Sequence, residues 1–283
     1  MFQLVLNLAI RGHDFNREDS VDQLADKISK HGLQTIQFAL PLSFPELASQ
    51  AENINLGMGN YFRRSFAKYD VEIGVLSCYI NMIHPDLNER QAALYKFNQY
   101  LRAAKSFGAS MVATETGCVD AEIHYTEKNF TNEAFELVVT SVKQMVACAE
   151  KVGMTVAIEG GWNHPIYSPL KMRQLLDRID SPNMQVILDV TNFLKADTAD
   201  QQREIIDEAF NLFASDLAAI HLKDFVVENG VVIPTAIGKG QMDFSYLLEK
   251  VAQTKPYLQL IMEETKEADV RDAISYLNNL TQV

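Results

Sequence analysis

Short apolar runs alternate with longer amphipathic segments along the whole chain. Eight of these runs are β-branched or otherwise apolar and are bounded by polar or glycine-containing turns, as is typical of strands. They cover residues 4–9, 35–40, 72–79, 111–115, 155–159, 185–189, 218–222 and 258–263. Helical periodicity fills the gaps, for example over residues 90–107, 132–152 and 201–213. Eight strands that alternate with helices predict an α/β fold, a single (β/α)8 TIM barrel.

The ends of the predicted helices agree with this alternation. Gly32, Gly108 and Gly153 each follow a helical segment and precede an apolar run, and glycine readily adopts the left-handed conformation that ends a helix. Ser168 and the proline after it are typical of an N-cap and a first helical position. No Pro/Ser-rich linker, low-complexity tract or block of charge divides the sequence. We therefore expect one domain over residues 1–283.

Composition and charge narrow the function classes. Of the 283 residues, 47% are hydrophobic and 22% are charged, which is an ordinary globular balance. The formal net charge of −12 repels polyphosphates, so we expect no nucleic-acid partner. No apolar stretch approaches the roughly 20 residues that span a bilayer, and the N-terminus lacks a basic leader. We therefore expect a soluble, cytoplasmic protein without a membrane partner.

The cysteines carry little functional signal in the sequence. Cys78, Cys118 and Cys148 are widely spaced and form no CxxC pair. This pattern argues against a disulfide framework and against a thiolate metal site, and it fits a reducing compartment.

The ends of the last four predicted strands carry the chemistry. The segments TVAIEGG, VILDVTN, AAIHLKD and LIMEET each join an apolar strand to an ionisable residue at its carboxyl end. These residues are Glu159, Asp189, His221 and Glu263. In a parallel barrel all strand carboxyl ends lie on one face, where barrel enzymes build their active sites. We therefore expect the four side chains to surround one point.

A divalent metal ion explains this quartet better than local structure does. One acidic residue after a strand is often a cap, and one histidine is often a packing residue, but four in succession are hard to explain that way. Three crowded carboxylates would repel one another unless a cation lies among them. The mostly oxygen ligand set suits Mn²⁺ best, with Mg²⁺, Co²⁺ or Zn²⁺ as alternatives.

These motifs resemble the xylose-isomerase-like TIM-barrel superfamily, in the sugar phosphate isomerase/epimerase group related to endonuclease IV. The resemblance covers essentially the whole chain and rests on VAIEGG, VILDVTN, HLKD, IGKGQMDF and IMEE. It implies that Glu159, Asp189, His221 and Glu263 are the metal ligands. Glu263 is preferred to Glu264 because it directly follows the apolar strand.

Two departures from the family pattern bear on the substrate. Endonuclease IV has a histidine three residues after the strand 6 aspartate, where this chain has Asn192, and VVIPTAIGKG lacks the aspartate and histidine that complete its third metal site. An abasic-site nuclease is therefore not expected. The ketose 3-epimerases carry a substrate-binding arginine six residues after the strand 7 histidine, where this chain has Val227.

Further residues on the same face are candidate substrate contacts. They are His84, Glu115, Trp162, His164, Asn192 and Lys223. Four of them also have a local alternative: a loop hydrogen bond for Glu115, simple exposure for the two histidines, and packing for Trp162. Gly238-Lys239-Gly240 could bind a phosphate through backbone N–H groups, or could simply form a tight turn.

The predicted reaction is proton abstraction next to a carbonyl, through a metal-stabilised enediolate. The resemblance implies that Glu159 and Glu263 are both metal ligands and the acid/base pair of a sugar, or sugar phosphate, isomerase or epimerase. One alternative is a dehydratase of an inosose or dehydroshikimate-type substrate, and another is a non-catalytic sugar-binding barrel. The expected partner is a small carbohydrate, and the family often forms homodimers.

Overall fold

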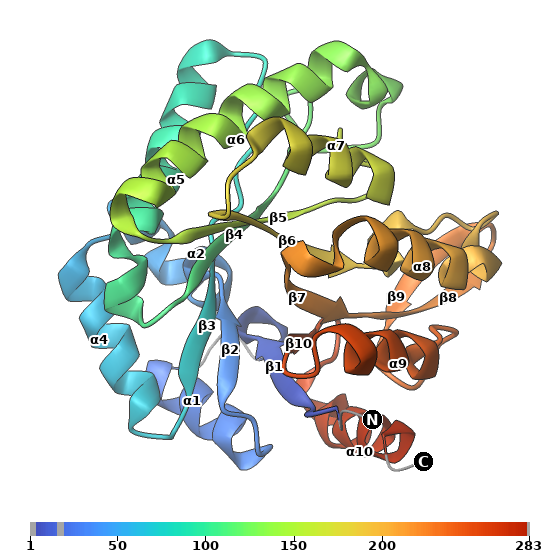
Figure 1. Cartoon of the computed structure of the whole chain (residues 1–283). Coiled ribbons are helices and arrows are strands. Elements are labelled where there is room, and N and C mark those ends of the chain that lie inside the picture. The colour runs from blue at the N-terminus through green and yellow to red at the C-terminus, as the bar shows by residue number, and fades with distance from the viewer. Residues whose placement is uncertain (1–3, 16–19, 282–283) are drawn as a thin grey trace.

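Eight parallel strands close into a barrel in the computed structural model, which describes residues 4–15 and 20–281 (Figure 1). They are β1 (Asn7–Arg11), β2 (Thr35–Phe38), β3 (Glu72–Ser77), β4 (Met111–Glu115), β5 (Thr155–Glu159), β6 (Met184–Asp189), β7 (Leu217–Leu222) and β10 (Gln259–Met262). Their order around the barrel is β1-β10-β7-β6-β5-β4-β3-β2, and β2 pairs with β1. The predicted (β/α)8 TIM barrel is confirmed.

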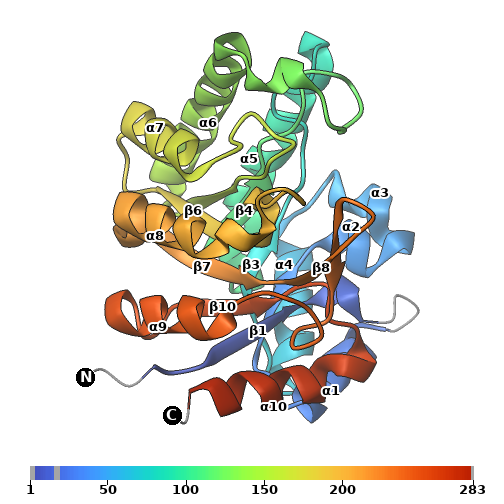
Figure 2. The same ribbon diagram turned by 90° about the vertical axis from the view of Figure 1, so that its right-hand side faces the viewer.

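Helices surround the barrel on its outside (Figure 1). They are α1 (Val21–Lys30), α4 (Leu56–Ala67), α5 (Leu87–Phe107), α6 (Asn132–Val152), α7 (Pro169–Ile179), α8 (Gln202–Phe213), α9 (Phe244–Thr254) and α10 (Val270–Leu280). The short helices α2 (Leu40–Ser43) and α3 (Ala48–Ala51) lie at one end of the barrel (Figure 2). Within residues 4–15 and 20–281, none of the helices combines the length and apolar character needed to cross a membrane.

The first strand is displaced from its predicted position. The apolar pattern predicts residues 4–9, whereas β1 covers Asn7–Arg11. Val5 donates its N–H to the carbonyl of Pro256, but the ladder with β10 begins only at Asn7, opposite Gln259. The apolar residues before Asn7 therefore lie outside the barrel ladder, and the strand extends to Arg11 at its other end.

Helix ends follow the predicted capping signals. Gly108 and Gly153 cap the carboxyl ends of α5 and α6 with φ of 83° and 65°, a region that residues with a Cβ rarely occupy. The hydroxyl of Ser168 accepts the N–H of Lys171 at the start of α7. These caps set the points at which the chain turns back into the next strand.

The barrel interior is filled by a layer of small and medium apolar side chains. Its members are Ala9, Val75, Ala113, Ala157, Ile187, Ala219 and Ile261. A larger apolar core lies between the strands and the outer helices. The interior of the barrel is therefore packed rather than open. Residues at the carboxyl ends of the strands lie directly on this apolar layer.

A β-hairpin that the sequence analysis did not anticipate follows β7. Strands β8 (Asp224–Glu228) and β9 (Val231–Thr235) pair antiparallel and form a separate two-stranded sheet. Their turn is Asn229-Gly230, with φ of 51° and 76°, as a tight two-residue hairpin turn requires. Figure 2 shows β8 standing at one end of the barrel.

Candidate metal centre

Polar side chains form a layer at the carboxyl ends of the barrel strands, one step above the apolar interior. On seven strands the residue two positions after the inward apolar residue is polar or charged. Because side chains alternate along a strand, these residues also point into the barrel. They are Arg11, Ser77, Glu115, Glu159, Asp189, His221 and Glu263. The candidate site therefore lies on the face that sequence analysis predicts.

The four predicted ligands meet at one buried point. His221 Nδ1 lies 2.8 Å from Glu263 Oε2, 3.2 Å from Glu159 Oε1 and 4.0 Å from Asp189 Oδ2. One ligand atom from each of the four residues lies within 4.8 Å of all the others, and all four residues are buried. Strand pairing explains part of this, because Asp189 and His221 occupy the same level of neighbouring strands.

Two buried carboxylate oxygens in this cluster face cationic side chains of the protein. They are Asp189 Oδ2, beside the Lys223 ammonium, and Glu263 Oε2, beside the His221 imidazole. A buried carboxylate is costly unless a cation is paired with it, and a coordinated metal ion is such a cation. Three carboxylates and one imidazole form a mostly hard ligand set, so the residues present fit a divalent metal ion.

Gln37 on β2 fixes the orientation of the His221 ring. His221 Nε2 lies 2.8 Å from Gln37 Oε1, and the Gln37 amide donates to Ser77 Oγ at 3.0 Å and to the Tyr79 hydroxyl at 3.2 Å. The amide oxygen can only accept, so Nε2 carries a hydrogen and Nδ1 faces the carboxylates. Sequence analysis missed Gln37.

Two cations lie against the carboxylates. Lys223 Nζ is 2.6 Å from Asp189 Oδ2, 3.0 Å from Glu263 Oε1 and 2.6 Å from Asn192 Oδ1. Arg11 Nη1 is 2.6 Å from Glu263 Oε1. Lys223, a candidate substrate contact from the sequence, thus lies against the quartet, whereas Arg11 was not anticipated.

The charges shift the pKa values of the cluster. Burial acts to lower the pKa of His221, but Glu159 and Glu263 raise it to about 10. Burial raises the pKa of Asp189 to about 6, although Lys223 opposes the shift. Burial also acts to raise the pKa of Glu263, yet Lys223 and His221 hold it well below its usual range. The negative charge of the carboxylates is therefore compensated by cationic side chains of the protein. A divalent ion at the same point would compensate that charge instead.

Comparison with known proteins places this fold and site in a family. The family model of the xylose isomerase-like TIM barrel matches residues 16–280. The chain belongs to this family. The resemblance inferred from the sequence motifs is thus confirmed. None of the curated protein sequences matches the chain.

Several solved structures are similar to this xylose isomerase-like barrel. D-psicose 3-epimerase with D-tagatose from Clostridium cellulolyticum H10 is 14% identical with a TM-score of 0.73, over 97% of this chain and 99% of that one. The IolI protein with a bound zinc atom is 14% identical with a TM-score of 0.74, over 97% and 96%. The probable 3-DHS dehydratase AsbF of petrobactin synthesis, from Bacillus anthracis, is 13% identical with a TM-score of 0.73, over 96% and 99%. At these identities the likeness shows the fold.

Three further predicted residues of the xylose isomerase-like barrel lie beside the quartet or near it. Asn192 Nδ2 donates to Glu159 Oε1 at 2.7 Å. Glu115 is opposite Glu159 in the β4–β5 ladder, and its side chain is 34% exposed. His164 Nδ1 lies 2.9 Å from the carbonyl of Gly117, which leaves Nε2 facing Glu115 Oε2 at 3.7 Å.

The two remaining predicted contacts lie farther out. Trp162 donates its backbone N–H to Asn192 O, and its ring lies 5.3 Å from that of Tyr125. His84 lies in the turn before α5, where its Nδ1 accepts the N–H of Asp86 at 3.2 Å. Among the contacts of the described residues, none joins His84 to the quartet. A role of His84 in substrate binding stays a prediction.

The Gly238-Lys239-Gly240 segment already has partners for its polar groups. The N–H groups of Gly238 and Gly240 donate to Asp224 Oδ2 at 2.9 and 2.8 Å. The Lys239 ammonium pairs with Asp269. These groups hold the loop against β8, which favours the tight-turn interpretation over a phosphate site.

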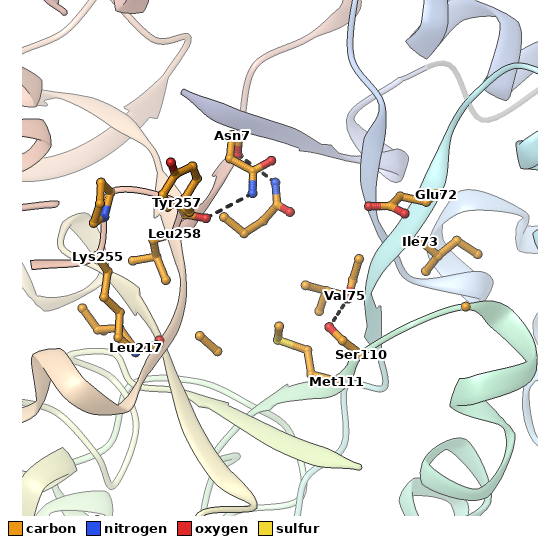
Figure 3. A pocket seen from close by; sticks show the side chains of 15 residues that line it. Asn7, Glu72, Ile73, Val75, Ser110, Met111, Leu217, Lys255, Tyr257 and Leu258 are labelled. Carbon is orange, nitrogen blue, oxygen red and sulfur yellow. Dashed lines mark hydrogen bonds between the residues drawn. The ribbon is translucent and has the colours of Figure 1, made fainter. Parts of the chain in front are cut away.

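A hollow of about 580 Å³ lies at the opposite end of this xylose isomerase-like barrel (Figure 3). Its lining includes Asn7, Glu72, Met111, Leu217 and Gln259, the first residues of five barrel strands. The hollow therefore marks the amino end of the barrel, and none of the predicted site residues lines it.

Proposed function

We propose that this protein is a divalent-metal-dependent sugar, or sugar phosphate, isomerase or epimerase. The observation that carries the proposal is the buried quartet of Glu159, Asp189, His221 and Glu263, in which one ligand atom of each residue lies within 4.8 Å of all the others. The similarity to an epimerase solved with D-tagatose supports a carbohydrate substrate. Mn²⁺ is the proposed ion, with Mg²⁺, Co²⁺ or Zn²⁺ as alternatives.

The proposed roles follow from the charges around each residue. When bound, the ion would supply Lewis-acid polarisation of a carbonyl and its neighbouring hydroxyl. Glu159 and Glu263 form the acid/base pair, and Asp189 and His221 mainly hold the metal. Glu263 Oε1 lies between Arg11 and Lys223, and these cations make its carboxylate a weaker base. We therefore assign the first proton removal to Glu159, whose Oε1 accepts a hydrogen bond from the neutral Asn192 amide.

The substrate would be bound by the polar groups around the quartet. Lys223 and Asn192 are paired at 2.6 Å and can offer an ammonium and an amide to substrate hydroxyls or carbonyls. Glu115 and His164 occupy the β4–β5 side of the site. In the proposal Trp162 is an apolar wall for a sugar ring, and His84 a more distant contact.

A dehydratase of an inosose or dehydroshikimate-type substrate is the second candidate, because the probable dehydratase AsbF has a similar structure. It would begin with the same proton removal and then expel a β-hydroxyl, to which the Lys223 ammonium could give a proton. The product would be unsaturated and absorb in the ultraviolet. A non-catalytic sugar-binding barrel is less well supported, since simple sugar binding does not require two glutamates beside a metal.

The decisive experiment combines metal analysis with solvent-deuterium exchange into a panel of ketoses and inososes. We expect one equivalent of metal at the quartet and deuterium at a single carbon of the substrate. Glu263→Gln should lose both, whereas Glu264→Gln at the neighbouring, more exposed residue should keep both. Absence of metal binding after addition of Mn²⁺, Mg²⁺, Co²⁺ or Zn²⁺ would overturn the proposal, and an ultraviolet-absorbing product would select the dehydratase.

The proposal also covers features that follow from the sequence and the family. We propose one domain over residues 1–283, a cytoplasmic location, and no nucleic-acid or membrane partner. Association into a homodimer is a family-based expectation that light scattering of the purified protein can test.

A further inference from the structure

A second group of metal-ligating side chains lies in the loop between β4 and α6. Cys118, Asp120 and His124 are close in sequence, and the structure brings one ligand atom of each within 4.8 Å of the other two. Cys118 is fully buried, whereas the side chains of Asp120 and His124 are 34% and 51% exposed. The group is therefore buried on its sulfur side and open to solvent on the other.

The imidazole of His124 is oriented as in a metal ligand. Its Nδ1 lies 2.9 Å from the carbonyl of Glu122, so Nδ1 carries the hydrogen and Nε2 is left with a lone pair. Nε2 lies 3.4 Å from Asp120 Oδ2. Metal-bound histidines typically donate their second ring N–H in this manner, which fixes the tautomer before the ion arrives.

The other two candidate ligands, Asp120 and Cys118, also contact neighbouring side chains that fix their position. Asp120 Oδ1 lies 3.3 Å from Lys128 Nζ, which leaves Oδ2 directed at His124. Cys118 Sγ accepts a hydrogen bond from the amide of Asn129 at 3.5 Å, and that amide also donates to the carbonyl of Asn163 at 2.7 Å. The Cys118 thiol in turn donates to the carbonyl of His124 at 3.6 Å, and a metal ion bound to Sγ would replace that thiol proton.

We propose that Cys118, Asp120 and His124 form a second divalent metal site that selects Zn²⁺, with solvent in the remaining coordination position. A thiolate and an imidazole favour zinc over Mn²⁺ and Mg²⁺, and three protein ligands plus water satisfy its tetrahedral geometry. The site is separate from the quartet in both residues and ligand type. The absence of a CxxC pair, which argues against a thiolate site from sequence, does not exclude this mixed ligand set.

Metal binding at this site would restrain the aromatic side chains next to it. Tyr125 directly follows His124, and its ring lies 5.3 Å from Trp162 and 5.8 Å from Phe130. An ion that joins the two ends of the segment from Cys118 to His124 would restrict this aromatic group. The second site would thus have a structural role on the β4–β5 side.

Cobalt titration of the metal-depleted full-length protein tests the proposal, because a cysteine thiolate bound to Co²⁺ gives a charge-transfer absorption in the near ultraviolet. We expect two equivalents of Co²⁺ with that absorption in the wild type. Cys118→Ser should lose the absorption and one equivalent. Cys148→Ser is the matched control, because that buried thiol lies on α6 near the carbonyl of Asn98, and it should change neither.

Two more variants separate this site from the quartet and from misfolding. His124→Ala alters a half-exposed side chain and should weaken binding of the absorbing Co²⁺ at least about tenfold. Asp189→Asn should remove the other equivalent and keep the absorption. The proposal is overturned if the wild type gives no charge-transfer band, or if the band persists in Cys118→Ser. Failure of the quartet alone would leave the band in place, so the two proposals fail independently.

Discussion

At the scale of single residues, Gln37 controls which nitrogen of His221 faces the carboxylates. Its amide accepts from Nε2 and is itself fixed by Ser77 and Tyr79, so the ring is held by a chain of buried hydrogen bonds. Without this partner an imidazole can change tautomer and rotate, and metal binding must then order it. Outer partners of this type contribute to affinity although they do not touch the ion.

Replacing Gln37 with leucine removes the acceptor and keeps approximately the side-chain volume. We expect the dissociation constant for Mn²⁺ to rise about 10–100-fold. Isothermal calorimetry measures it. Gln34→Leu, at an exposed position one residue before β2, is the matched control and should bind Mn²⁺ as the wild type does. Unchanged affinity in Gln37→Leu would show that another group orients the ring.

The raised pKa of His221 predicts the pH dependence of metal binding. Glu159 and Glu263 raise this pKa to about 10 in the metal-free protein, so His221 is protonated at neutral pH. A metal at Nδ1 must displace that proton, and affinity therefore increases as pH rises, up to about tenfold per pH unit. Calorimetry in buffers of different ionisation enthalpy should show release of about one proton per ion, and affinity independent of pH would contradict the assignment.

Sequence analysis reached the quartet but missed its partners for a physical reason. Glu159, Asp189, His221 and Glu263 each end an apolar run, so the contrast is visible along the chain. Gln37 lies inside the strand TIQF, where a buried polar residue looks like a local irregularity. Arg11 lies two residues beyond the predicted first strand, because that strand was expected to end at residue 9. For Arg11 the usable signal was its spacing of two from the inward apolar residue Ala9.

At the scale of elements, one aspartate holds the hairpin and the loop after it. Asp224 begins β8, and its Oδ1 accepts the N–H groups of Phe225 and Met242 at 2.9 and 3.0 Å. Its Oδ2 accepts those of Gly238 and Gly240. Four backbone donors thus depend on one carboxylate, and the bonds to Phe225 and Met242 are buried.

Removing this carboxylate should destabilise the protein. We expect Asp224→Ala to lower the free energy of unfolding by about 3–5 kcal/mol, because buried N–H groups lose a charged acceptor. Urea denaturation followed by circular dichroism measures the change. Asp243→Ala removes the N-cap of α9 and a largely exposed ion pair with Arg203, and should cost about 1 kcal/mol. Equal effects of the two substitutions would show that the Asp224 network is dispensable.

The hairpin itself had a sequence signal that was not used. Asn229-Gly230 lies between the apolar runs of β8 and β9, and this dipeptide strongly favours a two-residue hairpin turn. Neither strand of the hairpin belongs to the barrel, so the alternation of strands and helices does not indicate it. The strands β4 and β5 and helix α6, by contrast, coincide with their predicted ranges.

At the scale of the whole molecule, the fold was predictable because its signal is repeated. Eight apolar runs separated by amphipathic segments tolerate an error in any one of them, and the displaced β1 did not change the predicted barrel. The Cys118 group had no such repetition. Its residues come together only through the path of one irregular loop, which neither periodicity nor composition specifies.

The packed apolar layer inside the barrel limits how a substrate can enter and how a product can leave. Ala9, Ala157, Ile187, Ile261 and their neighbours fill the space between the polar layer and the amino-end hollow. A molecule that reacts at the polar layer therefore cannot pass through the barrel, and must both enter and leave at the carboxyl end of the strands. Product that has not yet left blocks the next arrival, so inhibition by product would be inherent in this architecture. Net flux would then depend on how quickly the following reaction removes that product.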